Sequence, residues 1–295
     1  MTTPDKSASL DRFDLFLFNL SKINHFSARM DCWYFKSSIS ERLVVIKDQI
    51  LAIPLAIHVL TESVIVPKLL GYILSFGNFM NGGTSRGQAD GFGLDLLAVI
   101  QDVKAKDNSC TLIQYIIRTL MRFEFVHVHV PEIAPVPSVE VMVKASECNF
   151  EKLSIVLDLL SKELTMCAQQ CNLLCFSGHL KTTMDDALFT TKVALELQTE
   201  KLICVQAEFE NYVAYFNDEK RYTPTEFFDV WRIFFVNFSI TWKVFLSSLS
   251  IVYISLIVLL SLIPLYILVQ FVCRDIFSTT SFHDHIFFFI LLLTN

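Results

Sequence analysis

The sequence predicts an all-α protein that ends in a long apolar segment. Apolar residues recur at helical spacing through most of residues 10–243, and glycine and proline gather in a few short breaks. A single alternating run, from Val126 to Val130, leads directly into prolines and is interpreted as part of a linker over residues 126–137. Helices are therefore expected to supply the core.

The composition excludes some classes of protein. The 295 residues carry 24 Lys and Arg against 30 Asp and Glu, a net charge of −6, so there is no basic footprint for nucleic acid. Mean hydropathy is high, at +0.48, because no charged residue occurs from Val244 to Cys273. Residues 1–9 are polar, lack the apolar core of a signal peptide and are expected to be disordered.

The first part of the body, from Leu10 to Ile57, is expected to form two helices with a short break between them. The apolar stripe of the first helix consists of Phe13, Phe16, Leu17 and Leu20. The segment Ser38–Glu41 matches a capping box that would open the second helix. Pro54 is expected to end its apolar stripe.

A third helix is predicted from Leu69 to Met80, and it runs into a glycine-rich loop. The adjacent Gly82 and Gly83 end a helix and permit positive φ. A short helix over residues 94–99 and a longer one over residues 111–125 are predicted to follow, separated by a charged loop.

A helical pattern then continues from Val139 to Tyr215, with a break expected at Ser177–His179. One heptad seam repeats every seventh residue and consists of Leu188, Leu195, Leu202, Phe209 and Phe216. The second seam holds Thr191 and Gln198 and is poor. A long helix packed within its own domain fits this pattern better than a free two-stranded coiled coil.

The last helix of the body has a sharp predicted start at Thr223–Glu226, with threonine as the cap, proline next and glutamate three residues on. A thick aromatic face follows at spacings of three and four, formed by Phe227, Phe228, Trp231, Phe234, Phe235, Phe238 and Trp242. Such a face is expected to be buried against another element.

Motifs of catalysis are absent from the sequence. It contains neither a phosphate-binding Gly-x-x-x-x-Gly-Lys-Ser/Thr loop nor a Gly-x-Ser-x-Gly nucleophile elbow. The carboxylate pairs Asp102/Asp107 and Asp185/Asp186 lie in stretches expected to be solvated. No catalytic residue, no cofactor and no enzymatic activity are predicted.

Metal binding is not predicted either. The eight cysteines are scattered and are expected to be free thiols. Cys167, Cys171 and Cys175 recur every four residues, on one helix face, but no second cluster of ligands accompanies them. His127 and His129 likewise lack a third ligand nearby in the sequence.

The segment Gly77 to Asp107 resembles the signature of the formin homology 2 (FH2) domain. That signature reads Gly-Asn-aromatic-Met/Leu-Asn-x-Gly, then Arg-Gly-x-Ala-x-Gly-Phe, Leu-x-x-Leu and Asp-x-Lys-x-x-Asp. Its four parts stand here at Gly77–Gly83, Arg86–Phe92, Leu94–Leu97 and Asp102–Asp107. The resemblance extends over residues 10–243 and is strongest to the branch that contains formin-1, formin-2 and cappuccino.

The resemblance implies an architecture and a function. Residues 10–243 would form the late knob, the coiled-coil helices and the post of an FH2 domain, an actin-binding module in cytoplasmic actin cytoskeleton organisation and filament assembly. Lys104 would contact actin. The post surface that receives the lasso of a second subunit would be shaped by Gly77, Asn78, Asn81, Gly82, Gly83, Arg86 and Gly87. The simpler alternatives are a plain helix C-cap at Gly82 and Gly83, and a solvated lysine at position 104.

The chain also departs from the family pattern. No lasso with paired tryptophans precedes residue 10, so the chain is expected neither to close a ring nor to nucleate actin alone. Residues 244–272 exceed the roughly 20 residues that span a bilayer. They are either a transmembrane helix kinked at Pro264 or translated intron, the interpretation favoured here, with residues 273–295 as a tail. The alternative function is a single-pass membrane-tethered fragment that binds a formin lasso without nucleating actin.

Overall fold

The structure of the chain is a computed structural model that describes residues 11–125, 130–174, 178–216 and 221–276, with side chains as far as Ile251. In order, its elements are α1 (Arg12–Ser21), α2 (Phe26–Thr61), α3 (Ile65–Met80), α4 (Leu96–Val99), the 3-10 helix η2 (Ile100–Asp102), α5 (Leu112–Glu124), α6 (Val139–Ser146), α7 (Phe150–Leu173), α8 (His179–Tyr215) and α9 (Pro224–Ile276). The strand-like structure within these ranges is one isolated antiparallel bridge between Lys104 and Thr111. The all-α prediction is confirmed, whereas the predicted disorder of residues 1–9 lies outside the described ranges.

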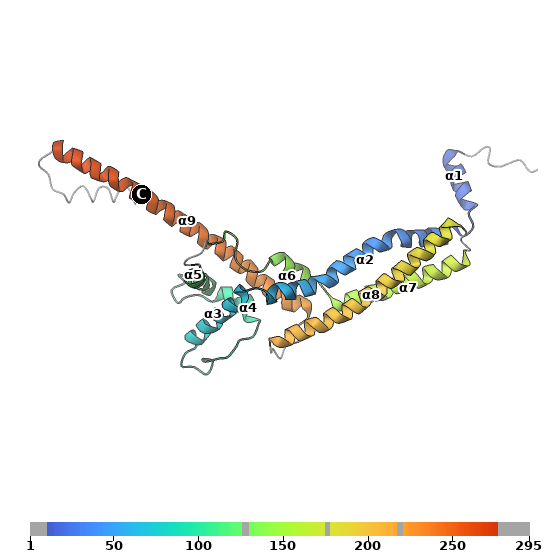
Figure 1. The fold of residues 1–295 in the computed structure, drawn as a ribbon, viewed down its shortest axis with the longest axis horizontal. Helices are drawn as coiled ribbons and strands as arrows, with labels where there is room; N and C mark the ends of the chain where they lie inside the picture. Colours follow the sequence, from blue (N-terminus) through green and yellow to red (C-terminus); the bar gives the residue numbers. More distant parts are fainter. Residues whose placement is uncertain (1–10, 126–129, 175–177, 217–220, 277–295) are drawn as a thin grey trace, which may run out of the picture.

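The molecule is elongated and has two parts (Figure 1). The long helices α2, α7 and α8 lie side by side in one arm. The helices α3, α4, α5 and α6 gather around the first part of α9 to form the other, and the rest of α9 extends away from both. Since α2 contacts α6 as well as α7 and α8, it joins the two parts.

The prediction that a helix begins at the Ser38–Glu41 capping box is wrong. Ser38 lies inside α2, and its Oγ donates to the carbonyl of Phe35 at 3.4 Å instead of capping a helix end. The helix begins twelve positions earlier, after His25, which takes a left-handed backbone conformation with φ of 57°. Buried contacts of Cys32 and Phe35 explain the longer helix, because tertiary packing outweighs a local capping preference.

Pro54 does not end the apolar stripe of α2 as predicted. The helix continues to Thr61, although proline removes one backbone hydrogen bond and costs about 3 kcal/mol in a helix interior. Ile53 and Ala56, which lie on either side of the proline, are fully buried. Core packing on both sides therefore holds the helix through the proline.

In the arm, α8 packs within its own domain, as predicted. Its seam residues Leu195, Leu202 and Phe209 are buried, and α8 packs on α2 and α7. The two polar residues of the second seam, Thr191 and Gln198, are buried as well, so α8 is enclosed on a wider face than the apolar pattern suggested.

The predicted uninterrupted pattern from Val139 has a break that the periodicity did not indicate. Asn149 separates α6 from α7, and its side chain accepts a hydrogen bond from the backbone N–H of Lys152 at 2.9 Å. Asparagine is a preferred N-cap, so this residue alone starts a new helix. Of the other predicted break, Ser177–His179, only Ser177 lies outside the described ranges, and Gly178 caps α8 with φ of 60°.

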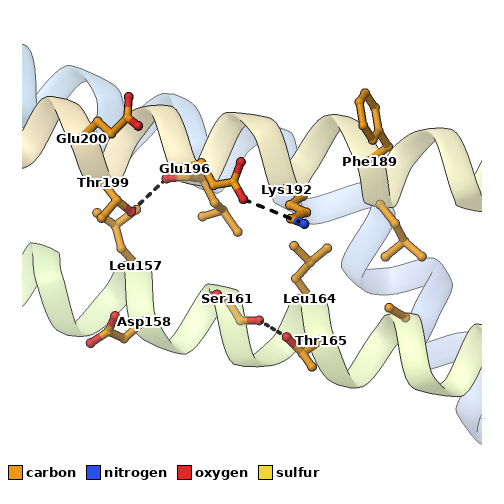
Figure 2. Close-up of a pocket in the computed structure, with 13 residues that line it drawn as sticks. Leu157, Asp158, Ser161, Leu164, Thr165, Phe189, Lys192, Glu196, Thr199 and Glu200 are labelled. Carbon is orange, nitrogen blue, oxygen red and sulfur yellow. Dashed lines mark hydrogen bonds and ion pairs between the residues drawn. The ribbon is translucent and has the colours of Figure 1, made fainter.

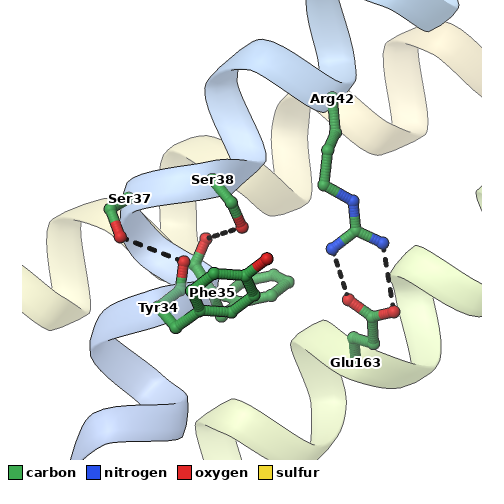
Figure 3. A network of polar contacts seen from close by, with 6 residues as sticks. All are labelled: Tyr34, Phe35, Ser37, Ser38, Arg42 and Glu163. Atoms are coloured by element: carbon green, nitrogen blue, oxygen red, sulfur yellow. Dashed lines mark hydrogen bonds and ion pairs between the residues drawn. The ribbon is translucent and has the colours of Figure 1, made fainter.

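One ion pair joins α2 to α7 on the partly exposed face of the arm (Figure 3). Arg42 donates two hydrogen bonds to the carboxylate of Glu163, at 2.7 and 3.1 Å. This bidentate contact lowers the pKa of Glu163 below its usual value and raises that of Arg42. The two side chains keep 39% and 45% of their exposure, so solvent screens the pair and its contribution is modest.

Replacing Arg42 with alanine is expected to lower the free energy of unfolding by about 0.5–1 kcal/mol at neutral pH. Because the pKa of Glu163 is depressed in the folded state, the pair stabilises above the carboxyl's unfolded pKa. This contribution is lost as the pH falls through the folded pKa. Urea unfolding at neutral and acid pH should therefore separate wild type from Arg42→Ala at neutral pH and bring them together in acid. An unchanged gap in acid would contradict the assignment.

The second part of the molecule is built on the aromatic face of α9. The predicted capping box at the start of α9 is confirmed. The Thr223 Oγ1 accepts from the Glu226 N–H at 3.2 Å, and the Glu226 carboxylate accepts from the Thr223 N–H at 3.0 Å. The predicted burial of the aromatic face is confirmed for every member: Phe227, Phe228, Trp231, Phe234, Phe235, Phe238 and Trp242. The helices α4, α5 and α6 cover this face.

Among the described residues, two helices are long and apolar enough to cross a membrane, Phe26–Thr61 and the Pro224–Ile251 part of α9. The first is a core helix of the arm, and the second carries the buried aromatic face. Beyond residue 251, α9 continues as a helix through Pro264 to Ile276.

Candidate functional site

The candidate site is the loop that follows α3, from Gly77 to Phe92. The N–H of Asn81, the C-cap residue, donates to the carbonyl of Gly77 at 3.0 Å and closes the helix. Eleven residues apart, the side chain of Asn78 pairs with the backbone of Ala89: its Nδ2 donates to the Ala89 carbonyl at 2.9 Å, and its Oδ1 accepts from the Ala89 N–H at 2.8 Å. This double contact fastens the far end of the loop to the helix.

A compact turn fills the first half of the loop. Thr84 donates from both its N–H and its Oγ1 to the carbonyl of Asn81, at 3.0 and 2.7 Å. The N–H of Gly87 then donates to the Thr84 carbonyl at 3.1 Å, which brings Gly87 back against Asn81. A Cβ at position 87 would lie 2.6 Å from the Asn81 carbonyl oxygen, so only glycine fits. Gly83 supplies the positive φ, 79°, that the turn requires.

These contacts divide the seven residues predicted to shape the partner surface into those that hold the loop together and those that leave a surface open. Asn78, Asn81 and Gly87 organise the loop itself, and one N–H and one acceptor position of the Asn78 amide are used within the chain. Arg86 is exposed, and its guanidinium forms no ion pair within the described part of the chain. Gly77 lies in α3 with open space where a side chain would be. The site is thus a preformed loop with a free surface.

A groove lies between this loop, α3 and the end of α8, with a volume of about 240 Å³. Its lining residues are mostly apolar: Leu70, Gly71, Leu74, Asp90, Gly91, Phe92, Leu94 and Phe216. Sequence reasoning missed Gly71 and Phe216, since neither belongs to the motif and Phe216 comes from a helix more than a hundred residues away. Placing Phe216 required knowing how α8 packs on the rest of the chain.

Lys104 lies in a short hairpin between η2 and α5. The Leu112 N–H donates to the Val103 carbonyl at 2.8 Å, and the Ala105 N–H donates to the Cys110 carbonyl at 3.0 Å. A capping box at Thr111, with Gln114 as its partner, anchors the hairpin to α5. Lys104 is exposed and is without an ion pair among the residues that the structure describes. The backbone of this lysine is therefore fixed, while its ammonium group faces solvent.

Beside Lys104, Asp107 closes the tip of the hairpin. The N–H and Oγ of Ser109 both donate to the Asp107 carboxylate, at 3.0 and 2.7 Å, and these bonds lower the pKa of Asp107. This carboxylate has an intrachain structural role. The Asp102/Asp107 pair is in a solvated stretch, as the sequence predicted, since both residues are exposed.

Comparison with known proteins assigns the family. A family model of the Formin Homology 2 Domain matches residues 2–239 of this chain. The chain belongs to the formin homology 2 family. Human Formin-2 is 33% identical over 248 residues, which is 80% of this chain, and chicken (Gallus gallus) Formin is 33% identical over 243 residues, or 78%. The Drosophila melanogaster protein cappuccino is 33% identical over 161 residues, or 54% of this chain.

These alignments cover a small part of each relative. The FH2 chain spans 14% of human Formin-2, 20% of chicken Formin and 15% of cappuccino. The family match ends at residue 239, before the uncharged segment that begins at Val244. The family match thus covers the helical body, including the loop, the groove and the hairpin.

A wider hollow of about 680 Å³ lies between α7 and α8 of the FH2 arm (Figure 2). Leu157 and Leu164 contribute apolar side chains, and Lys192 and Glu196 pair along α8 at 4.0 Å. The remaining polar contacts drawn there are threonine hydroxyls donating to carbonyls of their own helices. Because these contacts are made within single helices, this hollow is part of the coil surface.

Proposed function

We propose that this chain acts in actin cytoskeleton organisation and filament assembly, as an actin-binding formin homology 2 module in the cytoplasm. Its membership of the family supports this, because FH2 domains are actin-binding regulators and not enzymes. The chain is accordingly a binding protein, with actin and a second FH2 chain as its partners. The membrane-tethered alternative gains no support from the family match, which stops short of the apolar segment.

The observation that carries the actin proposal is the free ammonium group of Lys104 on a fixed hairpin. Lys106, two residues on, is also exposed and has no ion pair in the described ranges, so the hairpin presents two cations. Actin presents acidic surface near its barbed end. A cation held by a rigid backbone loses little entropy on binding and contributes through charge complementarity.

The groove supports the proposal of a second FH2 chain as partner. A Cβ added at Gly71 or Gly91 would meet nothing within 4 Å, so both glycines leave open space. Glycine inside a helix costs about 1 kcal/mol relative to alanine, and at Gly71 no internal contact offsets that cost. An extended segment of the partner could bring its backbone close here and insert an apolar side chain between Leu74 and Phe216.

The test is binding of the full chain to preassembled actin filaments by co-sedimentation, for wild type, Lys104→Glu and Lys162→Glu. Lys162 is exposed on α7, far along the arm, and serves as the matched control. Charge reversal at Lys104 is expected to weaken binding at least about fivefold, roughly 1 kcal/mol, with a reduced dependence on salt. Reversal at Lys162 should leave it unchanged. Equal effects of the two substitutions would refute the assignment of Lys104.

A further inference from the structure

Three cysteines meet inside the arm, although they come from distant parts of the sequence. Cys32 is on α2, and Cys167 and Cys171 are one turn apart on α7. All three are buried, and their Sγ atoms lie within 4.8 Å of one another. The sequence showed only the α7 members, because Cys32 precedes Cys167 by 135 residues.

The surroundings of the cluster are polar on one side. The Cys32 thiol donates to the Cys167 carbonyl at 3.8 Å and faces the Oε1 of Gln170 at 3.5 Å. Burial raises the pKa of both the Cys167 and the Cys171 thiol above the ordinary value. Close by, the Arg29 guanidinium donates to the Leu174 carbonyl at 3.1 Å and holds the start of α2 on the end of α7.

We propose that Cys32, Cys167 and Cys171 form a binding site for a thiophilic divalent cation, with Zn²⁺ as the best fit. Thiolates select soft and borderline metals such as zinc, and closed zinc sites with three cysteines are a common arrangement. At a Zn–S length of about 2.3 Å, three thiolates around one ion lie about 3.8–4.0 Å apart. The observed upper limit of 4.8 Å needs a side-chain adjustment of about 1 Å, which rotation about the Cα–Cβ bonds supplies.

A candidate donor for the fourth position lies beside the cluster. In a tetrahedral site with a Zn–O length of about 2.1 Å, a sulfur and an oxygen ligand lie about 3.6 Å apart. The Gln170 Oε1 is 3.5 Å from the Cys32 Sγ and comes from the same helix as Cys167 and Cys171. The amide oxygen of Gln170 thus lies within reach of the fourth position.

Binding is an exchange of protons for metal. Each thiol loses its proton to solvent as its sulfur forms a bond to Zn²⁺, and no electron is transferred. Three thiolates and one divalent cation leave a single net negative charge, which is easier to bury than separate thiolates. The bound ion would clamp α2 to α7 near the end of the arm.

The experiment uses the full chain, reduced with a phosphine and freed of metal with a chelator. Titration with Co²⁺ is expected to produce thiolate-to-cobalt charge-transfer and visible d–d absorption that saturates at one ion per chain, and added Zn²⁺ should displace it. Cys32→Ser and Cys167→Ser should each abolish the charge-transfer band. Cys204→Ser, which changes an exposed cysteine on α8, should retain it.

A second measurement separates metal binding from folding. Far-UV circular dichroism should give the same helix content for Cys32→Ser, Cys204→Ser and wild type without metal, while Zn²⁺ raises the thermal midpoint of wild type and Cys204→Ser only. The absence of a cobalt–thiolate band in the reduced full chain would overturn the proposal. So would a band of equal intensity in Cys32→Ser, since the pair on α7 would then act without α2.

Discussion

Replacing Trp242 with alanine is expected to lower the free energy of unfolding by about 3–5 kcal/mol, as for other large aromatic side chains removed from a core. Trp242 is fully buried on α9, and its ring stacks on Phe238 at 6.1 Å between centroids and meets the edge of Phe125 at 5.9 Å. Its Nε1 also donates to the carbonyl of Pro131 at 3.1 Å. One side chain thus joins α9, the end of α5 and the linker.

Two matched variants divide this effect into packing and hydrogen bonding. Trp242→Phe keeps an aromatic ring and leaves the Pro131 carbonyl without its donor, so a loss of about 1–2 kcal/mol is expected. Phe189→Ala removes a ring that is 70% exposed on α8 and should change stability by less than about 0.5 kcal/mol. Urea unfolding followed by far-UV circular dichroism measures all three. A loss for Trp242→Ala no larger than that for Phe189→Ala would show that the aromatic face is not the core of this part.

The aromatic core was predictable because the signals that specify it lie close together in the sequence. The start of α9 is specified by Thr223, Pro224 and Glu226, which are close in sequence and satisfy one another. The aromatic face follows from spacing alone, because residues three and four apart share a helix face. The end of α3 was predictable for the same reason, since Gly82 and Gly83 act on the adjacent backbone.

The features that could not be predicted depend on contacts between distant residues. The capping preference of Ser38 was outweighed by burial of Cys32 and Phe35 on α2, a helix that packs on α7 and α8, more than 100 residues away. Because Thr191 and Gln198 are polar, the sequence argued against a second buried seam on α8. In the structure both residues are nevertheless buried. At the site, the glycines and the FH2-like signature identified the loop but gave neither the Asn78–Ala89 pairing nor the contribution of Phe216 to the groove.

Substituting Gly87 with alanine is expected to disorganise the loop and to lose the proposed FH2 partner. The new Cβ would lie 2.6 Å from the Asn81 carbonyl oxygen and 3.4 Å from that of Thr84, so the turn must open. Overpacking of this kind costs about 1–3 kcal/mol. Hydrogen–deuterium exchange should show faster exchange at the backbone amides of positions 84 and 87 than in wild type. The affinity for the complete FH2 domain of human Formin-2 should fall at least about tenfold, as measured by surface plasmon resonance.

Gly71→Ala provides the complementary test, because it fills the groove without straining the fold. Position 71 is helical and meets nothing within 4 Å, so alanine should stabilise α3 by up to about 1 kcal/mol through its helix propensity. If a partner backbone approaches here, the same substitution should weaken FH2 binding about tenfold while stability is kept or raised. A stable Gly71→Ala protein with undiminished binding would place the partner elsewhere. Weak binding by Gly87→Ala alone would then reflect loss of the loop and not occupation of the groove.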